Sequence, residues 1–369
     1  MKICTIICEY NPLHNGHMRL LKFARQHADT ICCVMSGNFV QRGMPAVMDK
    51  YSRARHAILA GADIVIELPT VLALSSAENF ATGGVNIARA IGSQFLAFGC
   101  ESANAQQLFQ CATLLEDVKV NNSIKKFINE GNSYPKAVAM SLPQFEDILS
   151  RPNNTLALEY TKAILKSNSD IQLLVCDRPD NYDSDKLEGI FSSATAIRNN
   201  LDAENIRQSL PYFTKVEDIN VEVEKQYKRF AALYLSLQPM TEQTEAVSEG
   251  LHNRFNKFRN IGNYNKLIES VKTKRYTQTR LQRIIAAHLL GITKDITAVA
   301  KATTPYITVL AINSKREDLL TYIAQRQLDY TQQVADERRK LIDIDLKAQL
   351  LYSALTNKLP ISQLQKVDV

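Results

Sequence analysis

The chain has 369 residues, of which 45% are hydrophobic and 22% are charged, with 13 glycines and 11 prolines. This composition excludes disordered and fibrous proteins, and the length predicts two domains with a sizeable hydrophobic core. A formal charge of +6 is too small to indicate a nucleic-acid partner by itself, so the local distribution of charge has to decide that question.

The cysteines and the lack of long apolar runs indicate in which cellular compartment the protein resides. There are seven cysteines, an odd number, and several lie in apolar runs such as residues 31–35, so we expect reduced core residues. The first residues, MKICTIICEYNP, lack the apolar stretch of a signal peptide, and no run approaches the roughly 18 apolar residues that span a bilayer. The sequence predicts a cytoplasmic protein without a membrane partner and leaves the oligomeric state open.

Short apolar runs in residues 1–200 have the length and character of strands that are buried on both faces. They are residues 2–8, 30–35, 64–68, 95–99 and 171–176. Helical patterns separate them. This alternation predicts an α/β fold with a Rossmann-like parallel sheet and helices on both of its faces. Ligands of such sheets bind at the carboxyl ends of the strands.

The remaining periodic segments predict helices. They are residues 16–26, 50–60, 73–90, 104–115, 155–166 and 195–207, followed by 221–235, 241–249, 264–271, 278–290 and 335–355. Because we find no convincing strand after residue 216, we predict an α/β first domain over residues 1–215 and an all-α second domain over residues 216–369. No low-complexity linker separates them, so we expect them to pack together.

The first chemical signal, EYNPLHNGH at residues 9–17, directly follows the first strand. Asn11-Pro12 should end the strand, Gly16 permits close backbone approach, and His17 falls at the start of a helix. Two imidazoles and the free N–H groups of a helix terminus would then surround one anion, as a triphosphate requires. The alternatives are histidines that only cap the helix, or a zinc site, for which His27, His56, His252 and His288 offer no suitable spacing.

The second signal is FSSATAIR at residues 191–198. The hydroxyls of Ser193 and Thr195 at the head of a helix, with Arg198 one turn later, could hold β- and γ-phosphates. Alone, this pattern is typical of an ordinary helix cap. Together with His14 and His17 it predicts the second half of a nucleotide site.

These two motifs resemble the HxGH nucleotidyltransferase superfamily. Within it, longer strings resemble the bacterial tRNA(Met) cytidine acetate ligase family: CEYNPLHNGH, MSGNFVQRGMPAVMDKYSRARHAILAGADIVIELP, RPNNTLALEY, FSSATAIR and KRYTQTRLQRI. They run from the first residues to about residue 290. The resemblance implies an enzyme that uses ATP to activate acetate as acetyladenylate and then acetylates N4 of the wobble cytidine of elongator tRNA(Met).

The resemblance also implies an ATP site, with His14, His17 and Arg198 as catalytic residues. Its ATP-binding residues would be Ile7, Cys8, Glu9, Tyr10, Asn11, Pro12, Leu13, His14, Asn15, Gly16, His17, Met18, Arg19, Leu20, Gly99, Asn153, Arg178, Ser193 and Thr195. A turn glycine, a helix N-cap and an exposed loop arginine are the plain alternatives for Gly99, Asn153 and Arg178. Mg²⁺ is expected with ATP, although no metal-ligand motif indicates it.

Residues 36–43, SGNFVQRG, follow the second strand and could form a carboxylate or phosphate pocket, with Lys50 and Arg53 adding charge. A flexible loop beside a solvated basic helix is the alternative, and Lys50, Arg53 and Arg55 are also our second choice for RNA contacts.

Residues 251–290 hold nine Lys and Arg against one acid, Glu269, a local charge of 9 − 1 = +8. Phe255, Phe258, Tyr264 and Tyr276 are interleaved, as in surfaces that stack unpaired bases. We therefore predict tRNA binding here, through Lys272, Lys274, Arg275, Arg280 and Arg283. A small-molecule adenylyltransferase and a non-catalytic RNA-binding protein remain the alternative functions.

Overall fold

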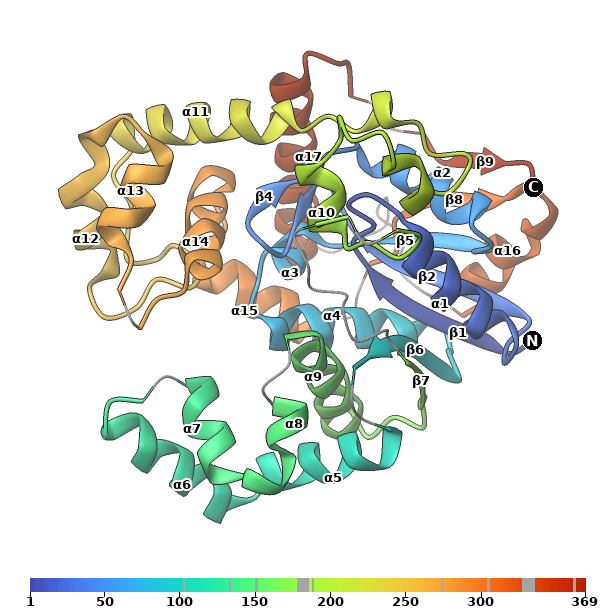
Figure 1. Cartoon of the computed structure of the whole chain (residues 1–369), viewed down its shortest axis with the longest axis horizontal. Coiled ribbons are helices and arrows are strands. Elements are labelled where there is room, and N and C mark those ends of the chain that lie inside the picture. Colours follow the sequence, from blue (N-terminus) through green and yellow to red (C-terminus); the bar gives the residue numbers. More distant parts are fainter. Residues whose placement is uncertain are drawn as a thin grey trace.

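A seven-stranded sheet forms the centre of the molecule (Figure 1). The computed structural model describes residues 1–101, 104–132, 134–149, 152–177, 186–187, 189–273, 275–303, 306–326, 336–360 and 363–369. The strand order is β7-β6-β1-β2-β5-β8-β9. The strands are β1 (Ile3–Cys8), β2 (Thr30–Ser36), β5 (Ile64–Leu68), β6 (Phe95–Cys100), β7 (Gln172–Asp177), β8 (Val309–Asn313) and β9 (Gln365–Val367).

The predicted α/β class with a parallel sheet is confirmed. β1 pairs in parallel with β2 and β6, β2 with β5, and β6 with β7. All five predicted strands are present, within one residue of the expected bounds at each end. They were recognisable because a strand that is buried on both faces leaves a short, continuous apolar run.

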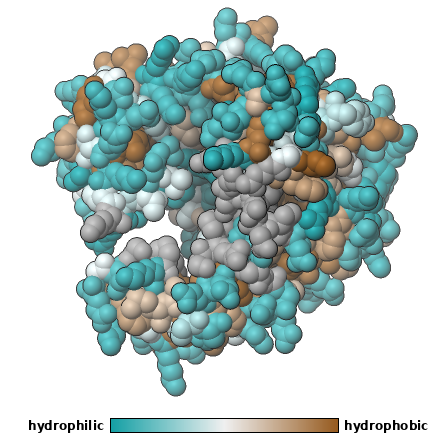
Figure 2. Space-filling model, viewed as in Figure 1, coloured by the Kyte–Doolittle hydropathy of each residue, from teal (hydrophilic) through white to brown (hydrophobic). Residues whose placement is uncertain are grey.

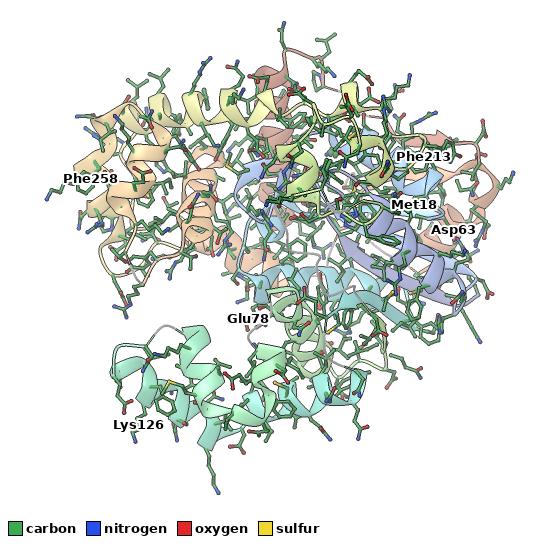
Figure 3. The ribbon with its side chains drawn as sticks, in the orientation of Figure 1. Met18, Asp63, Glu78, Lys126, Phe213 and Phe258 are labelled. Atoms are coloured by element: carbon green, nitrogen blue, oxygen red, sulfur yellow. The ribbon has the colours of Figure 1, made fainter. Side chains whose placement is uncertain are left out.

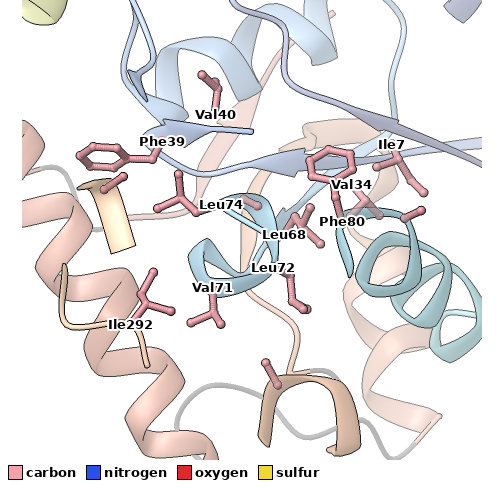
Figure 4. Close-up of a cluster of buried hydrophobic side chains, with 14 of the residues drawn as sticks. Ile7, Val34, Phe39, Val40, Leu68, Val71, Leu72, Leu74, Phe80 and Ile292 are labelled. Atoms are coloured by element: carbon pink, nitrogen blue, oxygen red, sulfur yellow. The ribbon is translucent and has the colours of Figure 1, made fainter. Parts of the chain in front are cut away.

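Helices cover both faces of the sheet. Ile3 and Ile7 of β1 belong to the core on the side of α4 (Ala77–Ala90), whereas Cys4 and Ile6 belong to the core beneath α1 (Asn15–Arg25) and α2 (Lys50–Leu59). Successive side chains of a strand point to opposite faces, which explains this division. Figure 4 shows the first core, with Ile7, Val34 and Leu68 of three neighbouring strands around Phe80 of α4. All seven cysteines are free thiols.

A lobe of helices is inserted between β6 and β7 and lies below the sheet in Figure 1. It comprises α5 (Ala105–Leu115), α6 (Val118–Asn129), α7 (Tyr134–Ser141) and α8 (Glu146–Leu149), and α9 (Pro152–Lys166) leads back to the sheet. The sequence predicted only α5 and α9. α6 has an apolar stripe of Val120, Ile124, Phe127 and Ile128, which pack in one cluster, but it was not singled out from the sequence.

The C-terminal region is mainly helical, as predicted. Its helices are α11 (Glu222–Leu237), α12 (Leu251–Phe258), α13 (Tyr264–Val271), α14 (Gln278–Leu290), α15 (Lys294–Ala302), α16 (Asp318–Gln325) and α17 (Asp336–Thr356). The helix predicted over residues 241–249 is absent, and turns occupy that stretch. Within the described ranges, no helix is long and apolar enough to cross a membrane.

The prediction that no strand follows residue 216 is wrong. β8 pairs antiparallel with β5, and β9 pairs in parallel with β8, so the end of the chain completes the sheet. A five-residue apolar run such as β8 cannot be distinguished by periodicity from part of a buried helix. Ile312 of β8 and Ile344 of α17 belong to the same core as Ile3. The two halves therefore share a hydrophobic core, and the domain boundary at residue 215 stays a prediction.

Ile312→Ala tests whether the C-terminal strand belongs to that core. Ile312 is fully buried, so the variant should lose roughly 2–5 kcal/mol of unfolding free energy in a denaturant titration. Ile190→Ala removes the same atoms from a side chain that is 60% exposed and should change it by less than about 0.5 kcal/mol. Equal losses in the two variants would contradict the shared core.

Candidate active site

A pocket of about 370 Å³ opens at the carboxyl ends of β1 and β6. At this point the strand order reverses, because the chain runs from β1 to β2 on one side and later crosses to β6 on the other. Open parallel sheets bind ligands at such switch points. The pocket is lined by Ile6, Ile7, Cys8, Glu9, Tyr10, Asn11, His14, His17, Leu20, Val40, Gln41, Arg42, Phe80, Phe98, Gly99, Leu156, Ala157, Tyr160, Ser193, Ala194, Thr195 and Arg198.

Most of the predicted site residues meet in this pocket, including the three proposed catalytic ones, although they come from both ends of residues 1–200. Gly99 and Thr195 line it as well. The other members of the predicted ATP loop, which do not line it, are Pro12, Leu13, Asn15, Gly16, Met18 and Arg19.

Three of these residues lie on a second surface. Asn15, Met18 and Arg19 line a separate hollow, and Figure 3 labels Met18 on α1. The backbone of Asn153 lies in the first turn of α9, and its side chain is outside the described residues, as is the whole of Arg178.

His14 and His17 form a reciprocal cap at the start of α1. His14 is the N-cap residue, and its Nδ1 accepts a hydrogen bond of 3.1 Å from the Gly16 amide. The His17 Nδ1 in turn accepts one of 3.3 Å from the His14 amide. The rings stack with their centroids 3.7 Å apart. The two histidines therefore do cap the helix, which was the alternative to a role in ligand binding. The same two rings also line the pocket.

This cap determines which tautomer each ring adopts in its neutral form. A ring nitrogen that accepts a hydrogen bond carries no proton, so the neutral form of each imidazole must hold its proton on Nε2. In that form, Nε2 is the ring atom of each histidine that carries the donor hydrogen. Donors placed in advance at the start of a helix suit a ligand that gains negative charge during a reaction.

Two arginines of the pocket lining meet at Thr195. Arg198 donates to Thr195 Oγ1 over 3.1 Å and to the Asn11 carbonyl over 2.6 Å, and Arg42 donates to the same hydroxyl over 3.2 Å. Burial, and next the charge of Arg42, lower the pKa of Arg198. An anion bound between the two guanidinium groups would relieve this repulsion.

Glu9 is the one carboxylate among the described lining residues. Its Oε1 accepts a hydrogen bond of 2.6 Å from the Gln41 amide. Burial raises the pKa of Glu9, and the Gln41 amide followed by Arg42, Arg53 and Arg198 opposes that rise. Two arginines, Arg42 and Arg198, and one carboxylate line the pocket, which leaves it electropositive.

The described residues offer no dedicated metal site. Among them, no group of three or more His, Cys, Asp or Glu side chains could hold a metal ion. Glu9 already accepts the Gln41 amide. The pocket therefore does not fit an all-protein site for Mg²⁺, and the zinc alternative for His14 and His17 has no third ligand in the part of the chain that is described.

Arg53 has a structural role that the sequence did not reveal. It is 0% exposed, and its guanidinium donates to four backbone carbonyls. Nε lies 3.0 Å from Met48 O, Nη1 lies 2.5 Å from Glu9 O and 3.2 Å from Ser36 O, and Nη2 donates to Gly37 O. This side chain ties the end of β1 to the end of β2, so it cannot contact RNA.

Lys50 is also buried and not a source of surface charge. Its Nζ lies 2.7 and 2.9 Å from the two carboxylate oxygens of Glu67, and Lys50 is 4% exposed. The prediction that Lys50 and Arg53 add charge to a ligand pocket is wrong, because both cations are used inside the protein. Arg55, on the same helix, is exposed.

The predicted RNA-binding residues differ in their surroundings. Lys272 and Arg275 are exposed, although Arg275 pairs with Glu249 at 2.8 Å. Arg280 donates to the Ala246 carbonyl over 3.0 Å and stacks on Tyr276. Lys274 lies outside the described residues.

The prediction of an RNA contact fits Arg283 least well. This residue is mostly buried, and its Nη1 lies 3.5 Å from the carbonyl of Gln41, which lines the nucleotide pocket. Arg283 belongs to α14 but lies beside a loop of the nucleotide pocket.

The predicted stacking platform is mostly unavailable. Phe255, Tyr264 and Tyr276 are buried in the core, since helices of this size need their aromatic side chains for packing. Phe258 remains partly exposed on α12, near the outer edge of the molecule in Figure 3, with Arg254 and Lys257 over its ring.

Sequence reasoning missed one apolar wall of the pocket. Phe80 comes from α4, and Leu156, Ala157 and Tyr160 come from α9. The only signal was RPNNTLALEY, in which the motif itself drew attention to Asn153. Arg42 was part of the loop at residues 36–43, but its basic side chain could not be told from a solvated one.

Arg53→Met tests the tie between β1 and β2. The variant keeps the length of the side chain but removes the donor that four backbone carbonyls share, so we expect a loss of about 3 kcal/mol or more in unfolding free energy. Arg55→Met on the same helix is the matched control and should cost less than about 0.5 kcal/mol. Similar denaturation midpoints for both variants would rule out this role.

Comparisons with known proteins agree with this geometry. Residues 1–367 match the HIGH Nucleotidyl Transferase family. The chain is 36% identical to the tRNA(Met) cytidine acetate ligase of Caldicellulosiruptor saccharolyticus, over 96% of this chain and 94% of that protein. It is also 36% identical to that of Clostridium novyi, over 87% of this chain and 86% of that protein.

Two solved structures are similar over nearly the whole chain. Thermotoga maritima TmcAL bound with alpha-thio ATP is 30% identical, with a TM-score of 0.86, over 96% of this chain and 95% of that one. The apo form I of the same protein is 29% identical, with a TM-score of 0.89, and the match covers 100% of both chains. By fold, site and full-length similarity, the chain belongs to the tRNA(Met) cytidine acetate ligases of the HIGH nucleotidyl transferase family.

Proposed function

We propose that the chain is an ATP-dependent ligase that activates acetate as acetyladenylate and acetylates N4 of the wobble cytidine of elongator tRNA(Met). One observation carries the proposal: in a chain of this family, the stacked histidines and the Arg42–Thr195–Arg198 group line one pocket at the switch point of the sheet. The names of the relatives indicate acetate and tRNA(Met) as substrates. The positive charge and hydrogen-bond donors of the pocket suit the ATP that such a ligase would use.

The two ends of ATP match different parts of the pocket. Phe98, Leu156 and Tyr160 form an apolar wall beside Gly99, which suits adenine, because the glycine has no side chain to block the base. His14, His17, Arg42 and Arg198 provide donors and positive charge for the triphosphate. Mg²⁺ would arrive on the phosphate oxygens with water as its other ligands, and no pocket residue is assigned to it.

The first step is attack by an acetate oxygen on the α-phosphorus, with departure of pyrophosphate. His14 and His17 donate through Nε2 to phosphate oxygens as their charge grows, while Arg42 and Arg198 neutralise the departing pyrophosphate. In the second step the cytidine amine attacks the acetyl carbon, the bond from that carbon to the bridging oxygen breaks, and AMP leaves with that oxygen. The amine proton passes to solvent.

His14→Ala and His17→Ala test the first step through pyrophosphate–ATP exchange with acetate and without RNA. Each variant should lower kcat by about 100-fold or more, since each removes a donor to developing charge. Both should remain folded, although each loses one capping hydrogen bond worth about 1 kcal/mol. Full exchange activity in both folded variants would exclude the assignment.

RNA binding is proposed for the exposed cations of the helical region. Figure 2 shows a notch between the lobe of α12 to α14 and the lobe of α5 to α8. Lys266, Lys272 and Arg275 are exposed on the upper lobe. We leave Arg283 out of this group because it contacts Gln41.

Reversing Lys266 and Lys272 to glutamate should weaken RNA binding and reduce its salt dependence by about one unit of slope for each lost phosphate contact. Exchange without RNA should persist. The matched control, reversal of Lys125 and Lys126 on the opposite lobe, makes the same change in net charge. Equal weakening in both double variants would mean that net charge, and not this lobe, determines affinity.

A further inference from the structure

A small hairpin connects the nucleotide pocket with the helical region. Its strands are β3 (Phe39–Val40) and β4 (Met44–Pro45), and Gln41, Arg42 and Gly43 join them. On the pocket side, the Gln41 amide donates to Glu9 over 2.6 Å. The position of Arg42 beside Thr195 therefore depends on where this hairpin lies.

On its other side the hairpin packs against the C-terminal helices. The ring of Phe39 meets Tyr227 of α11 edge to face, with the centroids 5.9 Å apart. The hydroxyl of Tyr264, on α13, lies 3.8 Å from the sulfur of Met44. Phe39 and Tyr227 are both fully buried. Rigid aromatic contacts of this kind hold the hairpin to the helices.

Gly43 marks the closest approach. It has a φ of +77°, and a Cβ at this position would overlap the backbone nitrogen of Arg283 and the carbonyl of Gln282, both on α14. A backbone clash cannot be relieved by rotating a side chain, so only glycine fits. The Arg283 guanidinium then reaches back over the tip, 3.5 Å from Gln41 O.

We infer that the β3–β4 hairpin is a positioning element through which the helical region holds Arg42 at the nucleotide, with Gly43 and Arg283 as positioning residues. This inference rests on the proposed function, because it takes Arg42 to bind the phosphates of ATP. It reassigns Arg283 from the RNA-contacting surface to the support of the site. It makes a pocket that is lined by residues 6–198 depend on helices far along the chain.

Gly43→Ala tests the inference by pushing the hairpin off α14. The variant should lower kcat for pyrophosphate–ATP exchange by about 10- to 100-fold and weaken ATP binding by a smaller factor, since Arg42 acts most strongly on the leaving pyrophosphate. Gly262→Ala is the matched control. Gly262 also has a positive φ, +68°, but a Cβ there has no neighbour within 4 Å. It should show the same backbone strain and retain wild-type kcat.

A double-mutant cycle with Arg42→Ala separates positioning from general damage. If Gly43 acts through Arg42, then Gly43→Ala should have no further effect on kcat in the Arg42→Ala background. Additive losses, or a Gly43→Ala variant that matches Gly262→Ala, would overturn the inference.

The double-mutant cycle can also be measured through ATP binding, without the reaction with acetate. Should the wild-type protein bind ATP but catalyse no exchange, the proposed function fails, and the same cycle is measured on the ATP dissociation constant by calorimetry. Non-additive weakening there would support the positioning role alone, and additive weakening would refute it. Arg283→Met should weaken ATP binding in the same direction as Gly43→Ala, and unchanged affinity in this variant would remove Arg283 from the element.

Discussion

Two hydrogen bonds in the first turn of α1 set the geometry of the site. They run from the Gly16 amide to His14 Nδ1 and from the His14 amide to His17 Nδ1, over 3.1 and 3.3 Å. They close the helix terminus and at the same time stack the two rings and leave the protons on Nε2. These rings lie just after the end of β1, where the strand order reverses. Capping a helix does not by itself require that position.

The loop that carries this cap is held by two arginines, the fully buried Arg53 and the partly buried Arg198. Arg198 donates to the Asn11 carbonyl, and Arg53 donates to the Glu9 carbonyl. Glu9 is the only carboxylate among the lining residues that are described, and two arginines, Arg42 and Arg198, line the same pocket. The excess of positive charge is what an anionic ligand would neutralise, so the same contacts that order the loop also favour a triphosphate.

The sequence was informative wherever a local pattern decides the structure. Continuous apolar runs marked the five parallel strands, and the order of strand, Asn-Pro, His and Gly placed His14 and His17 at a helix terminus. It was less informative where a distant partner decides. Lys50 and Arg53 look like solvated cations until Glu67 and four carbonyls enclose them. β8 forms a strand by pairing with the edge of β5, and this pairing cannot be read from the sequence of β8 alone.

The same limit applies to the basic segment at residues 251–290. Its charge pattern is genuine, but a count of charges does not separate exposed Lys272 from Arg283, which is mostly buried beside Gln41. Nor does it reveal that Phe255 and Tyr264 are core residues. Charge density thus located the region correctly as basic, while the roles of single residues followed from packing.

The central claim is that an acetate oxygen attacks the α-phosphorus of ATP in this pocket. Acetate labelled with ¹⁸O in both oxygens tests it directly, because the bridging oxygen of acetyladenylate stays with phosphorus when the amine takes the acetyl group. After a complete reaction with ATP and elongator tRNA(Met), mass spectrometry should find one ¹⁸O in AMP and none in pyrophosphate. Label in pyrophosphate or orthophosphate, or acetylated RNA together with unlabelled AMP, would contradict the account.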